Sequence, residues 1–227
     1  VGLPTSMEIA DSVRTVASLK ILDCDQERIL HRITSGHHLI CGPAGSGKTS
    51  LLIARGAVRH MQQEEERILV LCSSQALLTR LTNAWKRYPR IRVSTFPGWV
   101  REQGFWEDIP DSSPDSEHEL GEACFRRMSE GEGDVHRYDA VFIEEAHLFP
   151  AGWLRSARLA LRDPDHGDLI LVADGEEGCH GPEGINWREL GIHIHGHIHH
   201  LGITIGKAFQ NTREILCLAR LFLLPEA

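Results

Sequence analysis

The chain has 227 residues, of which 41% are hydrophobic and 25% are charged. This is ordinary globular composition, and it excludes disorder over the whole chain. The formal net charge of −8 argues against tight, sequence-independent coating of DNA. The length fits one large domain, or one domain with a small insert. We therefore expect no room for a motor made of two full domains.

Short apolar runs alternate with longer amphipathic stretches along the chain. The runs have the length of strands and are apolar throughout, which is typical of a parallel sheet covered on both faces. They lie at 38–41, 67–72, 92–96, 140–143 and 169–173. The stretches between them predict helices at 48–61, 75–87 and 151–162. This order predicts an α/β fold with a doubly wound parallel sheet and helices on both faces.

One segment interrupts the alternation. Residues 103–120 are rich in proline, serine and acidic residues, so we expect a solvated loop or small insert, followed by a helix through 124–128. The insert as a whole is placed at about 100–137. Residues 1–19 are expected to be an N-terminal extension, and residues 20–227 a single domain.

The six cysteines lie far apart and form no CxxC pair, which excludes a zinc ribbon or a thioredoxin motif. Cys41 and Cys72 stand inside apolar runs, as small buried hydrophobic residues do. A reduced, cytoplasmic protein is therefore expected. No apolar run approaches the roughly 18 residues of a membrane span, so we expect no membrane partner.

Residues 42–49 match the phosphate-binding pattern G-x-x-x-x-G-K-[ST] at every fixed position. The glycines let backbone N–H groups point at phosphate oxygens, and the following helix adds the positive end of its dipole. Lys48 is expected to reach the β- and γ-phosphates, and Thr49 to bind Mg²⁺. A glycine-rich turn that binds nothing is the alternative. The predicted nucleotide contacts are Gly42, Pro43, Ala44, Gly45, Ser46, Gly47, Lys48, Thr49 and Ser50.

Two acidic residues follow the apolar run at 140–143. A carboxylate at a strand end opposite Thr49 can hold Mg²⁺ through water, and the next one can orient and deprotonate an attacking water. We assign Glu144 to the metal and Glu145 to the water. Two surface acids without a function are the alternative, which the phosphate-binding pattern in the same chain disfavours.

Several segments, taken in order, resemble the motifs of the UvrD/Rep-type superfamily 1 DNA helicases. The similarity runs from about residue 20 to 220, and it implies a RecA-like P-loop NTPase that uses ATP and Mg²⁺ and acts on single-stranded DNA. The segments are 22–27 (Q-motif), 42–49 (motif I), 68–77 (motif Ia), 93–99 (the "TFHxW" segment), 138–147 (motif II), 169–177 with 184–187 (motif III and its sequel) and 209–215 (motif IV).

The resemblance also implies roles for individual residues. Gln26 would read adenine and Phe209 would stack on it, while Lys48 and Glu145 would be catalytic. The family's DNA path would run past three further residues, Ser74, Phe96 and Trp99.

The chain departs from the family pattern at several positions. Motif II begins with Glu144 instead of aspartate, which puts the geometry of the metal position in doubt. Glu177 replaces a glutamine that contacts the γ-phosphate, and a carboxylate facing a phosphate is repulsive. Gln210 replaces an arginine that stabilises charge during transfer, a loss that can lower the rate by orders of magnitude. The binding half of the site is therefore better preserved than the hydrolytic half, and the family's second RecA-like domain would have to come from elsewhere.

A basic stretch with interleaved aromatic residues suits single-stranded DNA, because bases stack on aromatic rings beside cations. A solvated basic face with Trp85 in the core is the equal alternative. The stretch comprises Arg80, Lys86, Arg87, Arg90 and Arg92, with Trp85 and Tyr88 between them.

Four histidines, His193, His195, His197 and His199, occupy alternate positions near the end of the chain, followed by His200. Period two places the four on one strand face, where they could bind Zn²⁺ or Ni²⁺. The solvated face of an edge strand is favoured over a metal site, since no cysteine or acid completes a ligand set.

Together these observations predict the ATP-binding domain of a UvrD-like DNA helicase. It would bind and hydrolyse Mg·ATP in a manner coupled to single-stranded DNA, with a second RecA-like domain or a partner protein. The alternative is a degenerate nucleotide-binding or interaction module without turnover, since Glu177 and Gln210 replace the expected γ-phosphate contacts.

Overall fold

The computed structural model describes residues 24–42, 45–105, 116–174 and 186–194. The helices in these ranges are α2 (Cys24–Arg32), α3 (Lys48–Gln62), α4 (Gln75–Ala84), α5 (Phe96–Glu102), α6 (Ser116–Ser129) and α7 (Ala151–Leu159), with 3-10 turns η2 (Ala146–Leu148) and η5 (Trp187–Leu190). The strands are β1 (His37–Gly42), β2 (Ile68–Cys72), β3 (Ile91–Thr95), β4 (Ala140–Ile143) and β5 (Asp168–Asp174).

The five strands form one parallel sheet in the order β1-β5-β4-β2-β3. Since all strands run the same way, their carboxyl ends meet at one edge, where ligands of open α/β sheets bind. The α/β fold expected from the sequence, a doubly wound parallel sheet with helices on both faces, is confirmed. The segment 42–49, called the P-loop below, joins its first strand, β1, to the next helix, α3.

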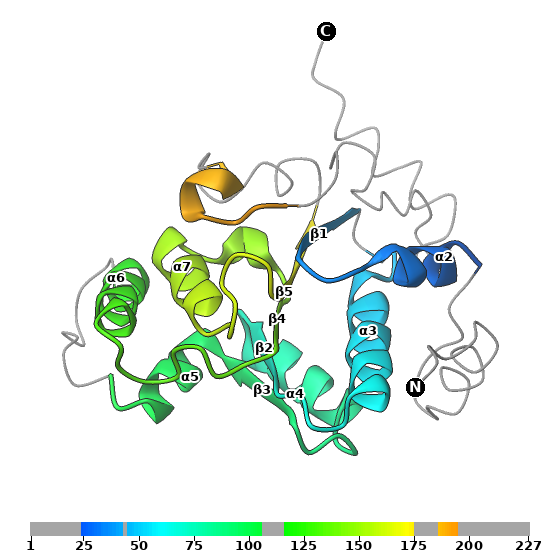
Figure 1. Ribbon diagram of the computed structural model, residues 1–227, viewed down its shortest axis with the longest axis horizontal. Coiled ribbons are helices and arrows are strands. Elements are labelled where there is room, and N and C mark those ends of the chain that lie inside the picture. Colours follow the sequence, from blue (N-terminus) through cyan, green and yellow to red (C-terminus); the bar gives the residue numbers. More distant parts are fainter. Residues whose placement is uncertain (1–23, 43–44, 106–115, 175–185, 195–227) are drawn as a thin grey trace, which may run out of the picture.

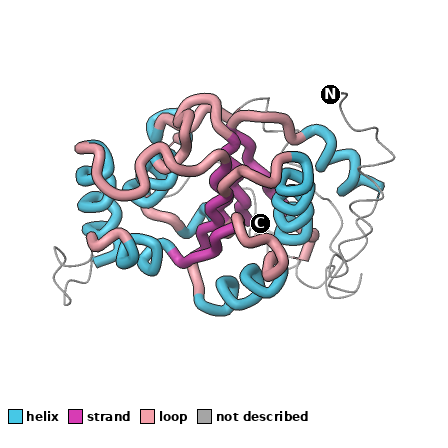
Figure 2. The backbone as a smooth tube through the Cα atoms, turned by 60° about the horizontal axis from the view of Figure 1, so that its bottom comes forward, coloured by secondary structure: helices cyan, strands magenta, loops and turns pink. Residues whose placement is uncertain are grey.

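Helices cover both faces of the sheet (Figures 1 and 2). Neighbouring residues of β5 point to opposite faces, as period two requires. Leu169 and Leu171 join one buried cluster, with α5, α6, α7 and η5. Ile170 and Val172 join the other, with α2, α3 and α4. A strand that is buried on both sides must be apolar throughout, which explains the continuous apolar runs in the sequence.

The helix predicted at 75–87 is shorter in the structure, where α4 ends at Ala84. Trp85 turns into the core, where its indole N–H donates to the carbonyl oxygen of Ile53 at 3.2 Å. Gly56 permits this approach, since a Cβ there would lie 3.0 Å from the indole nitrogen. The helix thus ends where Trp85, its C-cap residue, enters the core.

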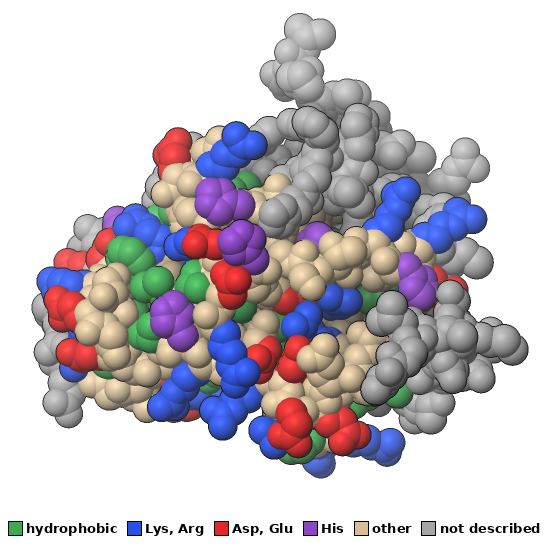
Figure 3. Space-filling model, viewed as in Figure 1, with side chains coloured by type: hydrophobic (Ala, Val, Ile, Leu, Met, Phe, Trp, Pro, Cys, Tyr) green, Lys and Arg blue, Asp and Glu red, His purple; other side chains and the backbone are tan. Residues whose placement is uncertain are grey.

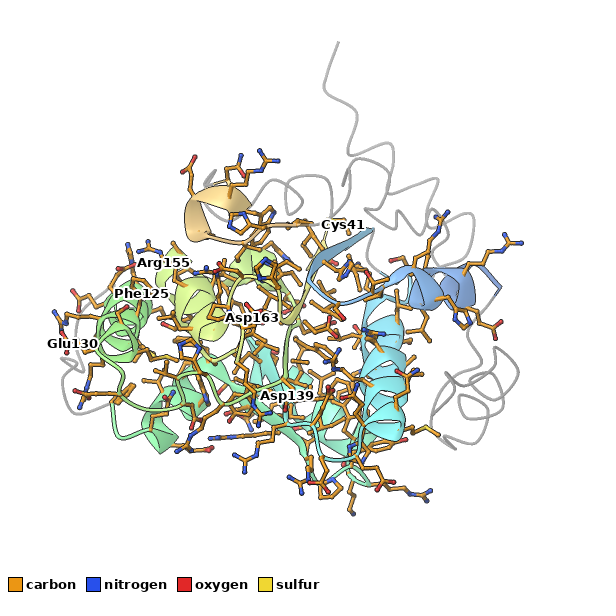
Figure 4. The ribbon with its side chains drawn as sticks, in the orientation of Figure 1. Cys41, Phe125, Glu130, Asp139, Arg155 and Asp163 are labelled. Carbon is orange, nitrogen blue, oxygen red and sulfur yellow. The ribbon has the colours of Figure 1, made fainter. Side chains whose placement is uncertain are left out.

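Helix α5 was not predicted from the sequence, because it has seven residues and follows β3 directly. The side chain of Thr95 caps it, accepting a hydrogen bond from the N–H of Gly98 at 3.2 Å. Pro97 fits its first turn, where the N–H would have no helical partner. The helix predicted through 124–128 is real but longer, and as α6 it packs against α7. Figure 4 shows this contact at Phe125 and Arg155, whose guanidinium carbon lies 5.2 Å from the ring centre.

A buried carboxylate ties α3 to the amino end of β5. The side chain of Asp168 is fully buried and pairs with Arg55 at 3.1 Å and with Arg59. Arg59 also holds Glu66 at 2.6 Å. This network fixes α3 relative to the sheet at the edge opposite the P-loop.

The cysteines differ in part from expectation. Cys72 and Cys124 are free and buried, and burial raises the pKa of each thiol to about 11. Cys41, labelled at the end of β1 in Figure 4, is disulfide-bonded. The expectation of a reduced thiol is therefore wrong for Cys41. Of the helices that the structure describes, none has the length and apolar character to cross a membrane.

Candidate nucleotide-binding site

The phosphate-binding pattern lies at the carboxyl edge of the sheet, between the end of β1 and the start of α3. Gly45 has φ 79° and Gly47 has φ 91°. Both angles lie in the left-handed region that side chains disfavour, so the turn requires glycine at these two positions. Ser46, between them, is buried. Pro43 and Ala44 lie outside the described residues.

Lys48 points back across this turn. Its Nζ donates to the carbonyl oxygen of Gly42 at 2.8 Å and forms an ion pair with Asp174 Oδ1 at 2.5 Å. The lysine side chain is 7% exposed and that of Asp174 is 44% exposed. Asp174 ends β5, the neighbour of β1, and pairs in register with Gly42. The ammonium group is therefore fixed at the mouth of the turn, where a phosphate would enter.

Thr49 and Glu144 meet at the same edge. The Thr49 hydroxyl donates to Glu144 Oε1, and the N–H of Glu144 donates to the carbonyl oxygen of Leu71 at 2.9 Å. Burial raises the pKa of Glu144 to about 7, and nearby Glu145 adds to this, while the bond from Thr49 opposes it. The first carboxylate after β4 thus faces the P-loop, as the sequence predicted.

These two residues fit a magnesium ion held with a nucleotide. Oε2 of Glu144 is buried and has no hydrogen-bond partner among the described residues, so its lone pairs can accept a metal-bound water. Hydroxyl and carboxylate oxygens are the ligands that Mg²⁺ prefers, and it keeps several waters. The longer side chain of a glutamate still reaches Thr49 directly.

Glu145 points elsewhere. Its backbone is left-handed, with φ 55° and ψ 47°, and its Oε2 accepts a hydrogen bond from the Ser73 hydroxyl at 2.7 Å. Ser73 follows β2, which lies on the side of β4 away from β1. The two carboxylates therefore diverge, one toward the P-loop and the other toward β2.

Three side chains at this edge were missed as site residues in the sequence. Asp174 pairs with Lys48, Ser73 holds Glu145, and His147 Nδ1 accepts a hydrogen bond from the N–H of Asp174 at 3.3 Å. Ser73 and Asp174 directly follow apolar runs that were themselves predicted, whereas His147 lies in η2, after the acidic pair. For Ser73 and Asp174 the place at a strand end was the available signal, since all carboxyl ends of a parallel sheet share one edge.

Two predicted DNA contacts are corrected by the structure. Phe96 and Trp99 have no exposed surface, so neither can stack on a base. Phe96 stacks on Trp153 with ring centres 4.4 Å apart, and the Trp99 indole N–H donates to Asp134 at 3.1 Å. Both lie on the inner face of α5. Ser74 is exposed, and its hydroxyl caps α4 by accepting from the N–H of Leu77.

Trp85 lies in the core, as one of the two alternatives for the basic stretch requires, while Arg80, Lys86 and Arg87 are exposed. Arg90 pairs with Glu65 at 2.7 Å, and Arg92 pairs with Glu102 and with Asp134. Figure 3 shows Lys and Arg interspersed with Asp and Glu on the face in view, without a continuous basic stripe. Neutralised arginines contribute little to phosphate attraction.

Several predicted residues lie outside the described part of the chain. The structure describes the backbone of Gln26 in α2 but not its side chain. The other residues outside it are Glu177, Phe209, Gln210, His195, His197, His199 and His200. His193 is described, and its N–H donates to His37 Nδ1 at 2.9 Å. The described residues contain no group of three or more His, Cys, Asp or Glu that could hold a metal ion.

The chain matches no known family model, and no curated protein has a matching sequence. Among solved structures it is similar to the UvsW helicase from bacteriophage T4, with 12% identity and a TM-score of 0.49 over 81% of this chain and 65% of that one. It is also similar to domain III of the replication initiation protein DnaA from Thermotoga maritima, with 14% identity and a TM-score of 0.35 over 78% and 55%. The chain thus spans less than two thirds of either protein chain. With TM-scores this low, the site itself has to carry any functional assignment.

Proposed function

We propose that this chain binds a nucleoside triphosphate with Mg²⁺ at Gly42–Thr49. The observation that carries the proposal is the junction of Lys48, Thr49 and Glu144 at the carboxyl edge of the sheet. A cation for the β- and γ-phosphates and an oxygen pair for the metal meet beside a turn whose glycines adopt φ values of 79° and 91°. A glycine-rich turn that bound nothing would not need a buried lysine at its mouth.

The residues divide the work in a defined way. Lys48 would neutralise phosphate charge, and the Thr49 hydroxyl with Glu144 would hold the metal. The metal, when bound, supplies further positive charge opposite the phosphates. Glu145 would accept the proton of an attacking water once it leaves Ser73.

A titration tests the binding step. We expect saturable binding of Mg·ATP to the wild-type chain and at least a tenfold weaker affinity for Lys48→Met, measured by calorimetry. Lys86→Met is the matched control, because Lys86 is an exposed lysine after the end of α4. Absence of ATP binding, or equal affinity in the wild type and Lys48→Met, would overturn the proposal.

We further propose that the chain is the ATP-binding domain of a UvrD-like DNA helicase, at residues 20–227 with an insert at about 100–137. The ordered motif set in the sequence supports this, with Ser74 as an exposed residue on the expected DNA side. Its hydrolysis would need single-stranded DNA and a second RecA-like domain. The test is the ATPase rate with and without single-stranded DNA, with that domain added as a separate chain, in the wild type and Glu145→Gln.

A nucleotide-binding module without turnover is the second candidate. The hydrogen bond from Ser73 to Glu145 favours it, because a carboxylate held toward β2 is not free to deprotonate water at the P-loop. DNA-stimulated hydrolysis that disappears in Glu145→Gln would reject this candidate. ATP binding without hydrolysis under all those conditions would reject the helicase assignment instead.

A further inference from the structure

Lys48 is bound by acceptors of the protein itself. Its ammonium donates to the carbonyl oxygen of Gly42 at 2.8 Å and pairs with the Asp174 carboxylate at 2.5 Å. The lysine is buried, so its charge is poorly solvated and depends on these acceptors. A phosphate that binds Lys48 must therefore replace at least one of these two contacts of the ammonium group.

Asp174 is placed for this contact by the sheet. It ends β5, which lies between β1 and β4, and it pairs in register with Gly42. The hydrogen bond from its N–H to His147 Nδ1 holds the strand end. Its carboxylate therefore lies at the mouth of the P-loop, on the same cation as the expected phosphates.

We propose that Asp174 competes with nucleotide phosphate for Lys48, and that nucleotide binding displaces its carboxylate; this inference rests on the proposed nucleotide site. Two anions cannot share one ammonium at close range without mutual repulsion. Asp174 can move, because it is 44% exposed, while Lys48 at 7% cannot leave the turn without losing its burial. Asp174 thus lowers the affinity for nucleotides whose phosphates reach Lys48 and leaves the affinity for other nucleotides unchanged.

Nucleotides should differ in their response to Asp174 because only some of their phosphates reach Lys48. The lysine of this pattern contacts the β- and γ-phosphates. ADP and ATP must therefore displace Asp174, whereas AMP has no phosphate at that position. Removing the carboxylate should help ADP and ATP and leave AMP unchanged.

The test compares dissociation constants of ADP, ATP and AMP for the wild type and Asp174→Asn, by calorimetry in the presence of EDTA so that no metal bridges the acids. We expect Asp174→Asn to bind ADP and ATP about tenfold more tightly, which corresponds to the loss of one competing charged contact. We expect less than twofold change for AMP. Asp174→Ser serves as a second variant, and thermal unfolding checks that both are folded.

Two further variants separate competition from general repulsion. In a Lys48→Met background, the effect of Asp174→Asn should fall below twofold, because no ammonium remains to compete for. Asp163→Asn removes the same charge from the loop before β5, at the opposite edge of the sheet (Figure 4), and should change no affinity.

Three outcomes would overturn the inference: unchanged ADP affinity in Asp174→Asn, weaker affinity, or an equal gain in the Lys48→Met background. The first and second mean that Asp174 does not oppose phosphate, and the third assigns the gain to long-range repulsion. If neither the wild type nor Asp174→Asn binds ADP or ATP in EDTA, the same comparison is made with Mg²⁺, and absence of binding there as well means that the nucleotide site itself is wrong. The failure of the inference and the failure of the proposed function therefore give different results.

Discussion

Replacing Glu144 with glutamine should remove a pH-dependent loss of stability. The side chain is 3% exposed, and burial raises its pKa from 4.5 to about 7. The folded protein therefore binds a proton that the unfolded chain releases between these two values. Stability contributed by this group is complete below pH 4.5, and it declines as the pH rises to about 7. Glutamine has no proton to lose, so Glu144→Gln should escape the decline.

The magnitude follows from the two pKa values. The difference between a pKa of 4.5 and one of about 7 corresponds to about 3 kcal/mol at pH values above both. Part of this change lies below pH 5.5, so between pH 5.5 and 8.5 the wild type should lose about 2 kcal/mol relative to Glu144→Gln. Any effect of the amide itself, such as its contact with Thr49, is independent of pH and cancels in the comparison.

Urea denaturation at pH 5.5, 7.0 and 8.5, with EDTA present, measures this difference. Glu130→Gln is the matched control, because Glu130 is exposed at the end of α6 (Figure 4), and its difference from wild type should not change with pH. Parallel stability curves for the wild type and Glu144→Gln would show that Glu144 is ionised in the folded protein across this range. The desolvation argument would then be refuted.

Three other substitutions test the packing around the site. Trp99→Ala should lower the free energy of unfolding by about 3–5 kcal/mol, because it leaves a cavity in the core. Urea denaturation measures this change, and a value near zero would mean that Trp99 is not a core residue. Asp168→Ala should cost about 3–5 kcal/mol at pH 7, since two arginines lose their buried partner; guanidinium denaturation measures it. Gly121→Ala should cost about 1–3 kcal/mol, because a Cβ there would lie 2.5 Å from Trp153 Cδ1 and 3.0 Å from its backbone nitrogen, and a lowered melting temperature would show it.

The strands and the P-loop could be predicted because their signals are local. The run predicted at 169–173 lies within β5, Asp168–Asp174, because a strand buried on both faces has to be apolar throughout. The glycines of the P-loop are likewise dictated by left-handed backbone at fixed positions.

The predictions fail where the role of a residue depends on the direction in which its side chain points. Phe96 and Trp99 were predicted to contact DNA, yet they form the inner face of a seven-residue helix too short to show a period in the sequence. The pair of Lys48 and Asp174 could not be predicted either. It depends on β5 lying next to β1, and the order of strands in a sheet is a property of the whole fold.

The three pairs at the carboxyl edge have one consequence in common. Lys48 is bound to Asp174, Thr49 to Glu144, and Glu145 to Ser73, so the groups needed for phosphate, metal and water each already have a protein partner. In the proposed nucleotide site, a phosphate would therefore have to replace the contact of Lys48 with Asp174, whereas Glu144 Oε2, which has no hydrogen-bond partner among the described residues, could accept a metal-bound water directly. Only the difference between old and new contacts of Lys48 would then appear as affinity. Hydrolysis would further need Glu145 to leave Ser73, whose hydroxyl donates to it at 2.7 Å. If the proposed site binds ATP, affinity for ATP alone would therefore not predict turnover.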